Sequence, residues 1–351
     1  MKARLGDVCT VVSGSTPKST VPEYWDGDIK WITPAELSND TYIINDSARH
    51  ITALGVAKTG LKSFPAGTVI LSSRAPIGKT AIAGCEMFCN QGFKNLICSE
   101  KIDSKYLYYF LSGKTDYLNS LGRGATFKEI SKAIVENIEI PLPEVEEQKR
   151  IAARFERLLR LIQLQKAEME ELDKLVKSRF IELFGDPETN PKGWTRQRLD
   201  QICENLDSRR VPITSTDRKA GNYPYYGASG IVDYVKDYIF DEDILLISED
   251  GANLVMRSTP IAFSVSGKVW VNNHAHVVRF ESKATQKYIE ICFALTDISG
   301  SITGTAQPKL NQAKLNAMMF CVPPIELQEQ FATFVEQTDK SKLCGRMEVA
   351  A

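Results

Sequence analysis

Residues 146–184 read EEQKRIAARFERLLRLIQLQKAEMEELDKLVKSRFIELF, a run of 39 residues without glycine or proline. Apolar side chains recur in it at alternating steps of four and three, a period of 3.5 that is typical of a helix packed along another long helix. Gly185 and Pro187 then end the pattern, as a C-terminal glycine followed by proline does. The seam positions are Ile151, Phe155, Leu158, Ile162, Gln165, Met169, Leu172, Val176, Arg179 and Leu183.

Two polar residues, Gln165 and Arg179, interrupt this seam. Buried polar groups can set the register of paired helices, whereas polar groups at a frayed seam are open to solvent, and the sequence alone favours neither reading. At 1.5 Å per residue the helix is roughly 57 Å long. Its apolar stripe therefore predicts a second long helix, from this chain or from a partner.

A shorter helix with the same spacing is predicted near the C-terminus, over residues 325–343. Phe331 and Val335 lie on its seam, followed by Thr338 and Lys342. Gly345 is expected to end it, with residues 344–351 as a tail. This predicts roughly 25 Å of partner for the first helix. The remaining seam would leave Leu and Val side chains in water at about 1.5–3 kcal/mol each, so we expect a second protein or a second copy to cover it.

Length and composition narrow the class of protein. A chain of 351 residues suggests two or more domains. We find neither an apolar run of 18 residues nor a signal-peptide pattern, and the eight cysteines form no CxxC pair, so we expect a cytoplasmic protein with reduced thiols. The net charge of −1 is unusual for a nucleic-acid binder. If the chain binds DNA, its cations gather on one face, or a partner supplies some of them.

Residues 1–145 are typical of a compact mixed domain. Short β-like runs at 8–12, 29–32, 69–71, 80–83 and 96–98 are separated by turn signals such as Pro65-Ala66-Gly67. Helices are predicted near Ser104–Leu111 and Phe127–Ile134. An extended exit over residues 138–143 leads into the long helix.

Residues 190–324 repeat this plan. Arg198-Leu199 with Cys203 corresponds to Arg4-Leu5 with Cys9, and later pairs follow in the same order. They are Lys287-Tyr288 with Lys105-Tyr106, Ala306 and Lys309 with Ala125 and Lys128, Pro324 with Pro143, and Gln328 and Ala332 with Gln148 and Ala152. Because the order is shared throughout, we predict an internal duplication of a globular unit followed by a helix.

The repeat resembles the specificity subunit of type I restriction–modification enzymes. The resemblance covers nearly the whole chain. It is carried by the exits Ile140-Pro141-Leu142-Pro143 to Ile151 and Val322-Pro323-Pro324-Ile325 to Phe331, by Leu183–Pro187 with Asn190–Trp194, and by Gly27–Ile32, Tyr223–Gly230 and Trp270–His276. It implies an α+β fold with two target-recognition domains, at 1–145 and 186–324, held apart by antiparallel helices at 146–185 and 325–343.

The same resemblance implies a function without catalysis by this chain. The two domains would each read one half of a bipartite site on double-stranded DNA. The helices would dock methyltransferase (modification) subunits, two in number, and restriction subunits would join them. S-adenosylmethionine, ATP and magnesium would belong to those partners. The alternative is a coiled-coil assembly or regulatory protein derived from such a subunit.

Candidate DNA contacts are basic, aromatic or amide side chains in turns and loops. The turn over residues 71–80 and the glycine-rich segments 122–128 and 303–309 are the main ones, and the last two lie where a helix is predicted to start. For Tyr225 and Tyr226 core packing is an equal alternative, and His274 and His276 could form a hydrogen-bonded structural pair sharing one face of a strand. The candidates are Arg74, Lys79, Lys94, Arg123, Thr126, Lys128, Tyr225, Tyr226, Asn253, His274, His276, Gln307 and Lys309. The predicted docking positions are Ile151, Phe155, Leu158, Ile162, Met169, Leu172, Val176, Leu183, Phe331 and Val335.

Other chemistries find little support in the sequence. Gly78-Lys79-Thr80 lacks the earlier glycine of a P-loop, since position 73 is Ser. Asn190-Pro191 is followed by Lys-Gly, which is not a methyltransferase motif, and we find no glycine-rich S-adenosylmethionine loop. The acidic run at 248–253 and the two histidines lack the further ligands that a metal site needs. We therefore predict a reader of DNA without a metal site.

Overall fold

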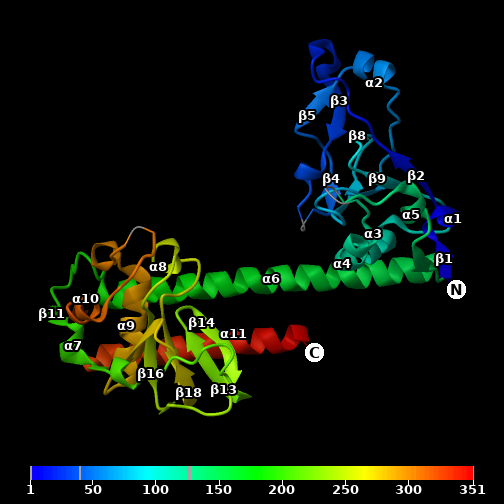
Figure 1. Cartoon of the computed structure of the whole chain (residues 1–351). Helices are drawn as coiled ribbons and strands as arrows, with labels where there is room; N and C mark the ends of the chain where they lie inside the picture. Colours follow the sequence, from blue (N-terminus) through cyan, green and yellow to red (C-terminus); the bar gives the residue numbers. More distant parts are fainter. Residues whose placement is uncertain (1, 39–40, 125–127, 305, 351) are drawn as a thin grey trace. The chain divides into compact units, whose positions relative to one another are not determined.

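The computed structural model describes residues 2–38, 41–124, 128–304 and 306–350, the last seven of these by their backbone alone. The chain divides into two compact units, residues 1–161 (unit 1) and 162–351 (unit 2). Helix α6 (Val145–Phe184) begins in unit 1 and ends in unit 2. Figure 1 shows the elements of both units and labels many of them.

Unit 1 contains a five-stranded sheet of order β2-β9-β6-β7-β4, a three-stranded sheet of order β5-β3-β8 and a two-stranded sheet, β1-β10. The strands are β1 Lys2–Arg4, β2 Cys9–Ser13, β3 Trp25–Ile32, β4 Ile43–Ile44, β5 Arg49–Ile51, β6 Val69–Leu71, β7 Thr80–Ala83, β8 Phe88–Cys89, β9 Lys94–Cys98 and β10 Glu139–Pro141. The helices are α1 Leu5–Val8, α2 Ala53–Thr59, α3 Ser104–Ser112, α4 Thr115–Leu121 and α5 Lys132–Glu136, with short 3-10 turns at Pro22–Tyr24 and Pro34–Glu36.

The central strands of unit 1 are buried on both faces. Val69 and Leu71 of β6 share a core with Leu107 of α3, whereas Ile70 between them packs in a second core with Phe93. Successive side chains of a strand point to opposite faces, so a run of three apolar residues supplies both cores. This explains why such short runs could be predicted as strands.

Unit 2 contains four-stranded sheets of order β12-β19-β16-β17 and β14-β13-β18-β15, and a two-stranded sheet, β11-β20. The strands are β11 Thr195–Arg198, β12 Glu204–Asn205, β13 Ala220–Gly227, β14 Gly230–Val235, β15 Phe240–Asp241, β16 Ile244–Ser248, β17 Ala262–Val265, β18 Lys268–Val271, β19 Ala275–Arg279 and β20 Met319–Val322. The helices are α7 Leu199–Ile202, α8 Asn253–Met256, α9 Lys283–Leu295, α10 Gln312–Asn316 and α11 Ile325–Ala350, with short 3-10 turns at Asp207–Arg209 and Ser299–Ser301.

Unit 2 repeats the plan of unit 1. Its sheet order β12-β19-β16-β17 follows β2-β9-β6-β7, and β11-β20 follows β1-β10. In β16, Leu245 and Ile247 face the core that contains Phe293 of α9, while Leu246 faces the core that contains Val271 of β18. The predicted fold class, two mixed α+β units with a long helix, is confirmed.

Helices α6 and α11 pack antiparallel within unit 2. The rings of Phe180 and Phe184 each lie 5.5 Å from the ring of Phe331. Further along, Lys342 Nζ lies 2.6 Å from Asp173 Oδ1. Later residues of α11 therefore contact earlier residues of α6, so the two helices run in opposite directions. The seam predicted from the heptad pattern is formed at this end of α6, around Phe331. Val176, Phe331 and Val335 are buried in it, which contradicts their predicted role as docking positions for another subunit.

The predicted end of the second helix is wrong. α11 continues through Gly345 to Ala350, 26 residues in all, so residues 344–350 are helix rather than tail. One glycine inside a helix costs only about 1 kcal/mol relative to alanine. Here Arg346, Met347 and Glu348 follow it, all good helix formers, and proline does not. α11 is thus about 39 Å long, and the length mismatch with α6 is smaller than predicted.

The predicted helix over 127–134 also differs, and Phe127 itself lies outside the described residues. Helix α5 begins at Lys132, because the Ser131 side chain accepts the Ile134 N–H at 3.3 Å as an N-cap. Ile130 N–H donates to Ser73 O and Glu129 N–H donates to Arg123 O, each at 2.9 Å, which holds Glu129 and Ile130 outside a helix. Lys128 therefore does not lie at a helix N-terminus. In the part of the chain that the structure describes, we find no helix with the length and hydropathy of a membrane span.

Candidate nucleic-acid interface

Each unit has a place where two loops meet at one end of its central strands. In unit 1, Arg74 and Arg123 both form backbone bridges with Glu129. In unit 2, Asp250 and Thr303 both form backbone bridges with Lys309. We call the first place junction 1, comprising the described residues of 72–79 and 122–131 with Lys94. Junction 2 comprises the described residues of 248–257, 274–276 and 302–311, with Asp207 and Arg210.

Junction 1 is built around the carboxylate of Glu129. Arg74 Nε lies 2.9 Å from one of its oxygens, and Lys94 Nζ lies 3.1 Å from the other. Lys94 is buried and also donates to Ser73 Oγ at 3.3 Å. Burial raises the pKa of Glu129, but the bonds from Lys94 and Arg74 outweigh it and lower the pKa overall. Glu129 is therefore a charged anchor between the two loops.

Junction 2 has the same arrangement with the charges exchanged. The acid, Glu249, now follows the central strand, and the cation, Lys309, lies on the opposing loop with Nζ 3.0 Å from Glu249 Oε1. Arg210 Nη1 lies 2.6 Å from the other oxygen. Burial raises the pKa of Glu249, and these hydrogen bonds outweigh it, so the net shift is downward. Each junction is thus closed by one carboxylate between two cations.

A buried histidine supports junction 2 from below. His276 Nδ1 lies 2.6 Å from Asp207 Oδ2, and its Nε2 donates to Leu310 O at 2.7 Å. Burial raises the pKa of Asp207, but the hydrogen bond from His276 and the other contacts lower it overall. Because Leu310 follows Lys309, the hydrogen bond from His276 to Leu310 O fixes the position of the loop that carries Lys309.

The two junctions differ in charge. Junction 1 contains five cations and one acid: Arg74, Lys79, Lys94, Arg123, Lys128 and Glu129. Junction 2 contains three of each: Arg210, Arg257, Lys309, Asp207, Glu249 and Asp250. The chain's net charge of −1 therefore hides a local excess of cations in unit 1, of which Arg74, Arg123 and Lys128 are exposed. Phosphate attraction is expected to be stronger at junction 1 than at junction 2.

The predicted contacts of unit 1 come together at junction 1, but Lys94 is buried there, which contradicts a DNA-facing role for it. Arg123 and Lys128 are exposed there, and Arg74 is half-exposed. Lys79 is half-buried and donates through Nζ to Leu37 O, so it holds the turn rather than facing solvent. Thr126 lies outside the described residues.

In unit 2 the predicted contacts divide. Gln307 and Lys309 are exposed, and His274 is exposed with Nδ1 2.9 Å from Asp250 Oδ2. Tyr225 and His276 are buried, which contradicts a DNA-facing role for either. The shared face predicted for the two histidines is also wrong, because His274 precedes β19 and only His276 lies within the strand.

Two further predicted residues have structural contacts. Tyr226 is half-buried, and its ring centroid lies 6.0 Å from that of Phe263. The Asn253 side chain holds its own segment: Oδ1 accepts from Ser258 Oγ and Thr259 N, each at 3.0 Å, and Nδ2 donates to Thr259 O at 3.0 Å. An adenine could be read by Asn253 only if these bonds broke.

Sequence reasoning missed the residues that organise the junctions. Glu129 and Glu249 were not predicted as anchors, because no sequence motif marks such an acid and its cationic partners are distant in the chain. It also missed Val255 and Met256 of α8, whose exposure at junction 2 no periodicity could reveal in a four-residue helix.

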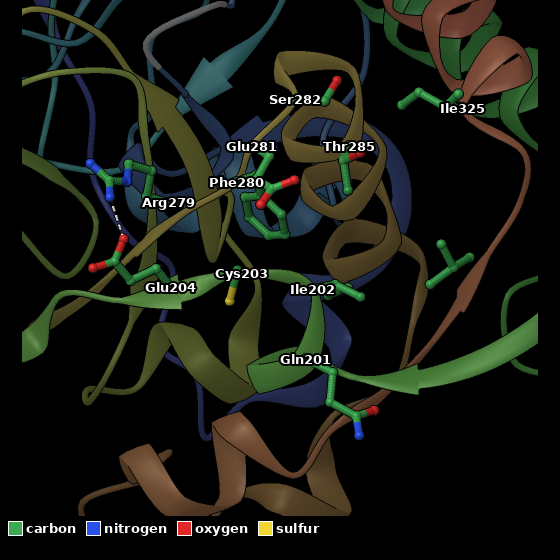
Figure 2. Close-up of a pocket in the computed structure, with 11 residues that line it drawn as sticks. Gln201, Ile202, Cys203, Glu204, Arg279, Phe280, Glu281, Ser282, Thr285 and Ile325 are labelled. Atoms are coloured by element: carbon green, nitrogen blue, oxygen red, sulfur yellow. Dashed lines mark hydrogen bonds and ion pairs between the residues drawn. The ribbon is translucent and has the colours of Figure 1, made fainter.

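A hollow of about 640 Å³ lies elsewhere in unit 2. Figure 2 shows its lining, with Cys203 and Phe280 inside and the Glu204–Arg279 ion pair at one side. It adjoins the Arg279 end of β19, whereas junction 2 lies at the Ala275 end. Burial raises the pKa of the Cys203 thiol to about 12, so it is not a reactive thiolate. Across residues 2–38, 41–124, 128–304 and 306–350, we find no cluster of three or more metal-ligating side chains.

Comparisons with known proteins agree on one family. Residues 1–174 and 191–344 match the family described as type I restriction modification DNA specificity domain. The chain is 31% identical over 370 residues to the MjaIX specificity subunit of Methanocaldococcus jannaschii, covering 95% of this chain and 85% of that protein. It is 24% identical over 356 residues to the EcoprrI specificity subunit of Escherichia coli, covering 95% and 86%.

Solved structures share the fold. The type I restriction–modification S subunit from M. genitalium aligns over 100% of this chain and 92% of its own, with a TM-score of 0.58 at 16% identity. A chain from a study of complex assembly in the type I system aligns over the same shares, with a TM-score of 0.59 at 17% identity. The chain therefore belongs to the family of type I restriction–modification specificity subunits, which recognise DNA sequence and are not the catalytic subunits of their enzymes.

Proposed function

We propose that this chain reads a bipartite DNA site, with junction 1 on one half-site and junction 2 on the other. The observation that carries the proposal is the repetition of one loop-closing arrangement in both units with different side chains. Because the exposed residues differ, the two half-sites differ in sequence.

Within junction 1, the exposed cations contact the DNA backbone. Arg123 and Lys128 have the exposure for phosphate contacts, and half-exposed Arg74 can reach a phosphate or a guanine edge. Lys94 and Glu129 are positioning residues, since they hold the loop from beneath. In junction 2, Lys309, Gln307 and His274 take the polar contacts.

The long helix docks the modification subunits, two per chain in this proposal. Large apolar side chains along α6 are exposed, which is costly unless a partner covers them. They are Phe155, Leu158, Leu159, Leu161, Leu164, Leu175 and Ile181. Restriction subunits join through these partners. S-adenosylmethionine for adenine methylation, and ATP and magnesium for cleavage, bind to the partner subunits.

The salt dependence of DNA binding by the assembled complex tests the phosphate contacts. The logarithm of affinity falls with the logarithm of salt concentration by about 0.9 per phosphate contact. Arg123→Gln is expected to reduce this slope by about 0.9 and to weaken binding to all sequences alike. Lys58→Gln, an exposed cation on α2 outside junction 1, is the matched control. Equal slopes for wild type and Arg123→Gln would remove Arg123 from the interface.

A further inference from the structure

Helix α8 presents two large apolar side chains to solvent at junction 2. Val255 is 64% exposed and Met256 is 73% exposed, the highest value for a large apolar side chain among the residues described. Leu254 beside them is buried in the core, so one side of α8 packs on unit 2 and the other side, with Val255 and Met256, faces solvent. We call this solvent-facing side the apolar edge. Together they form a small apolar patch on junction 2, and contiguous apolar patches mark interaction sites more often than single exposed side chains do.

This apolar edge is held rigidly. The residue after α8, Arg257, has a φ of 49°, a left-handed conformation that is costly for a residue other than glycine. Its guanidinium donates to Phe293 O and Thr296 O, each at 2.7 Å. The Asn253 amide fixes the other end of the turn, as described above. A frame of this kind keeps Val255 and Met256 outward despite the backbone strain.

The edge belongs to junction 2 rather than to an unrelated surface. Gly251 N–H donates to Pro308 O at 3.1 Å, and Asp250 bridges Lys309, so the segment entering α8 is joined to the loop that carries Lys309. In unit 1 the corresponding segment exposes Arg74. Junction 2, with equal numbers of acids and cations, exposes apolar side chains where junction 1 exposes a cation.

We infer that Val255 and Met256 determine specificity by packing against the methyl group of a thymine in the half-site of unit 2. The inference rests on the proposed function and names the chemistry read at junction 2. A thymine displays its methyl group in the major groove, which is wide enough to admit a turn of helix, while the minor groove is about half as wide. Lys309, on the loop bonded to the segment that enters α8, supplies a cation for a neighbouring phosphate.

Uracil in place of thymine tests the inference, because the two bases differ only by this methyl group. Each thymine of a duplex carrying the bipartite target is replaced in turn, and binding by the complex of this chain with its modification subunits is measured. One position in one half-site is expected to lose about fourfold in affinity, the contribution of one buried methyl group. The double variant Val255→Ala, Met256→Ala is expected to bind the thymine and uracil duplexes equally.

Controls separate contact from folding. Met319→Ala, on β20 and 52% exposed, is expected to keep the thymine-to-uracil ratio of wild type. Met256→Leu, which keeps a large apolar side chain at this position, is expected to retain most of the wild-type thymine-to-uracil ratio. The inference is overturned if no thymine is sensitive, or if the double variant keeps the wild-type ratio. It is also overturned if the double variant assembles poorly with the modification subunits but keeps the wild-type thymine-to-uracil ratio, because the two side chains would then contact protein and not DNA.

The proposed function fails by a different result. A complex that binds no DNA, or one whose salt slope is unaffected by any exposed cation of junctions 1 and 2, contradicts the bipartite reader itself. Normal slopes together with an insensitive double variant contradict only the thymine contact.

Discussion

Glu129 and Glu249 each lie between two cations that come from other segments of the chain. Glu129 is on the opposing loop of junction 1, whereas Glu249 follows the central strand of junction 2. Neither has a sequence signature. The exposed cations of the junctions could be predicted from the sequence, because basic residues beside glycines are typical of DNA-binding loops. The acids that hold those cations in place became visible only when distant segments were brought together.

These carboxylates predict an acid-sensitive fold. Their folded pKa values lie below the ordinary value of 4.5, so each stabilises the protein above that pH and loses its contribution as the pH falls through its folded pKa. The double variant Glu129→Gln, Glu249→Gln is expected to be less stable at pH 7 and to lose less stability on acidification below pH 4.5. Urea unfolding between pH 7 and pH 3 measures this, and parallel pH curves for both proteins would contradict it.

The two histidines of β19 and its entry form a matched pair. His276→Ala removes the partner of buried Asp207 and is expected to lower the free energy of unfolding by about 3–5 kcal/mol. His274→Ala, whose side chain is 53% exposed beside Asp250, is expected to cost less than about 1 kcal/mol. Chemical denaturation of both variants decides between this assignment and one in which the two histidines contribute equally.

At the scale of elements, the heptad pattern predicted α6 nearly to the residue, and short apolar runs between turn signals made the central strands predictable. The errors fell where a local signal was overridden. Gly345 does not end α11, because favourable residues follow it. The Ser131 cap starts α5 later than its apolar pattern indicated, since Ile130 is bonded to Ser73.

The seam between α6 and α11 predicts a contrast between two phenylalanines. Phe331→Ala, fully buried against Phe180 and Phe184, is expected to cost about 3–5 kcal/mol of stability. Phe155→Ala, 46% exposed on α6, is expected to change stability by less than about 1.5 kcal/mol. The same Phe155 variant is expected to bind modification subunits more weakly in a pull-down assay. Wild-type binding by Phe155→Ala would contradict its place in the docking surface.

For the whole molecule, duplication was the most informative property of the sequence. It predicted two units of one plan, and the structure confirms the shared sheet order. Net charge was the least informative, because acids elsewhere in the chain balance the cations of junction 1. The proposed function rests on two junctions of different charge in one chain.

Base-resolution mapping of DNA methylated by this chain together with its modification subunits is the direct test of whether the chain reads a bipartite site. We expect one methylated motif, made of two different half-sites separated by a gap of constant length. Methylation at a single continuous motif, at two identical half-sites, or at half-sites with a variable gap would contradict it.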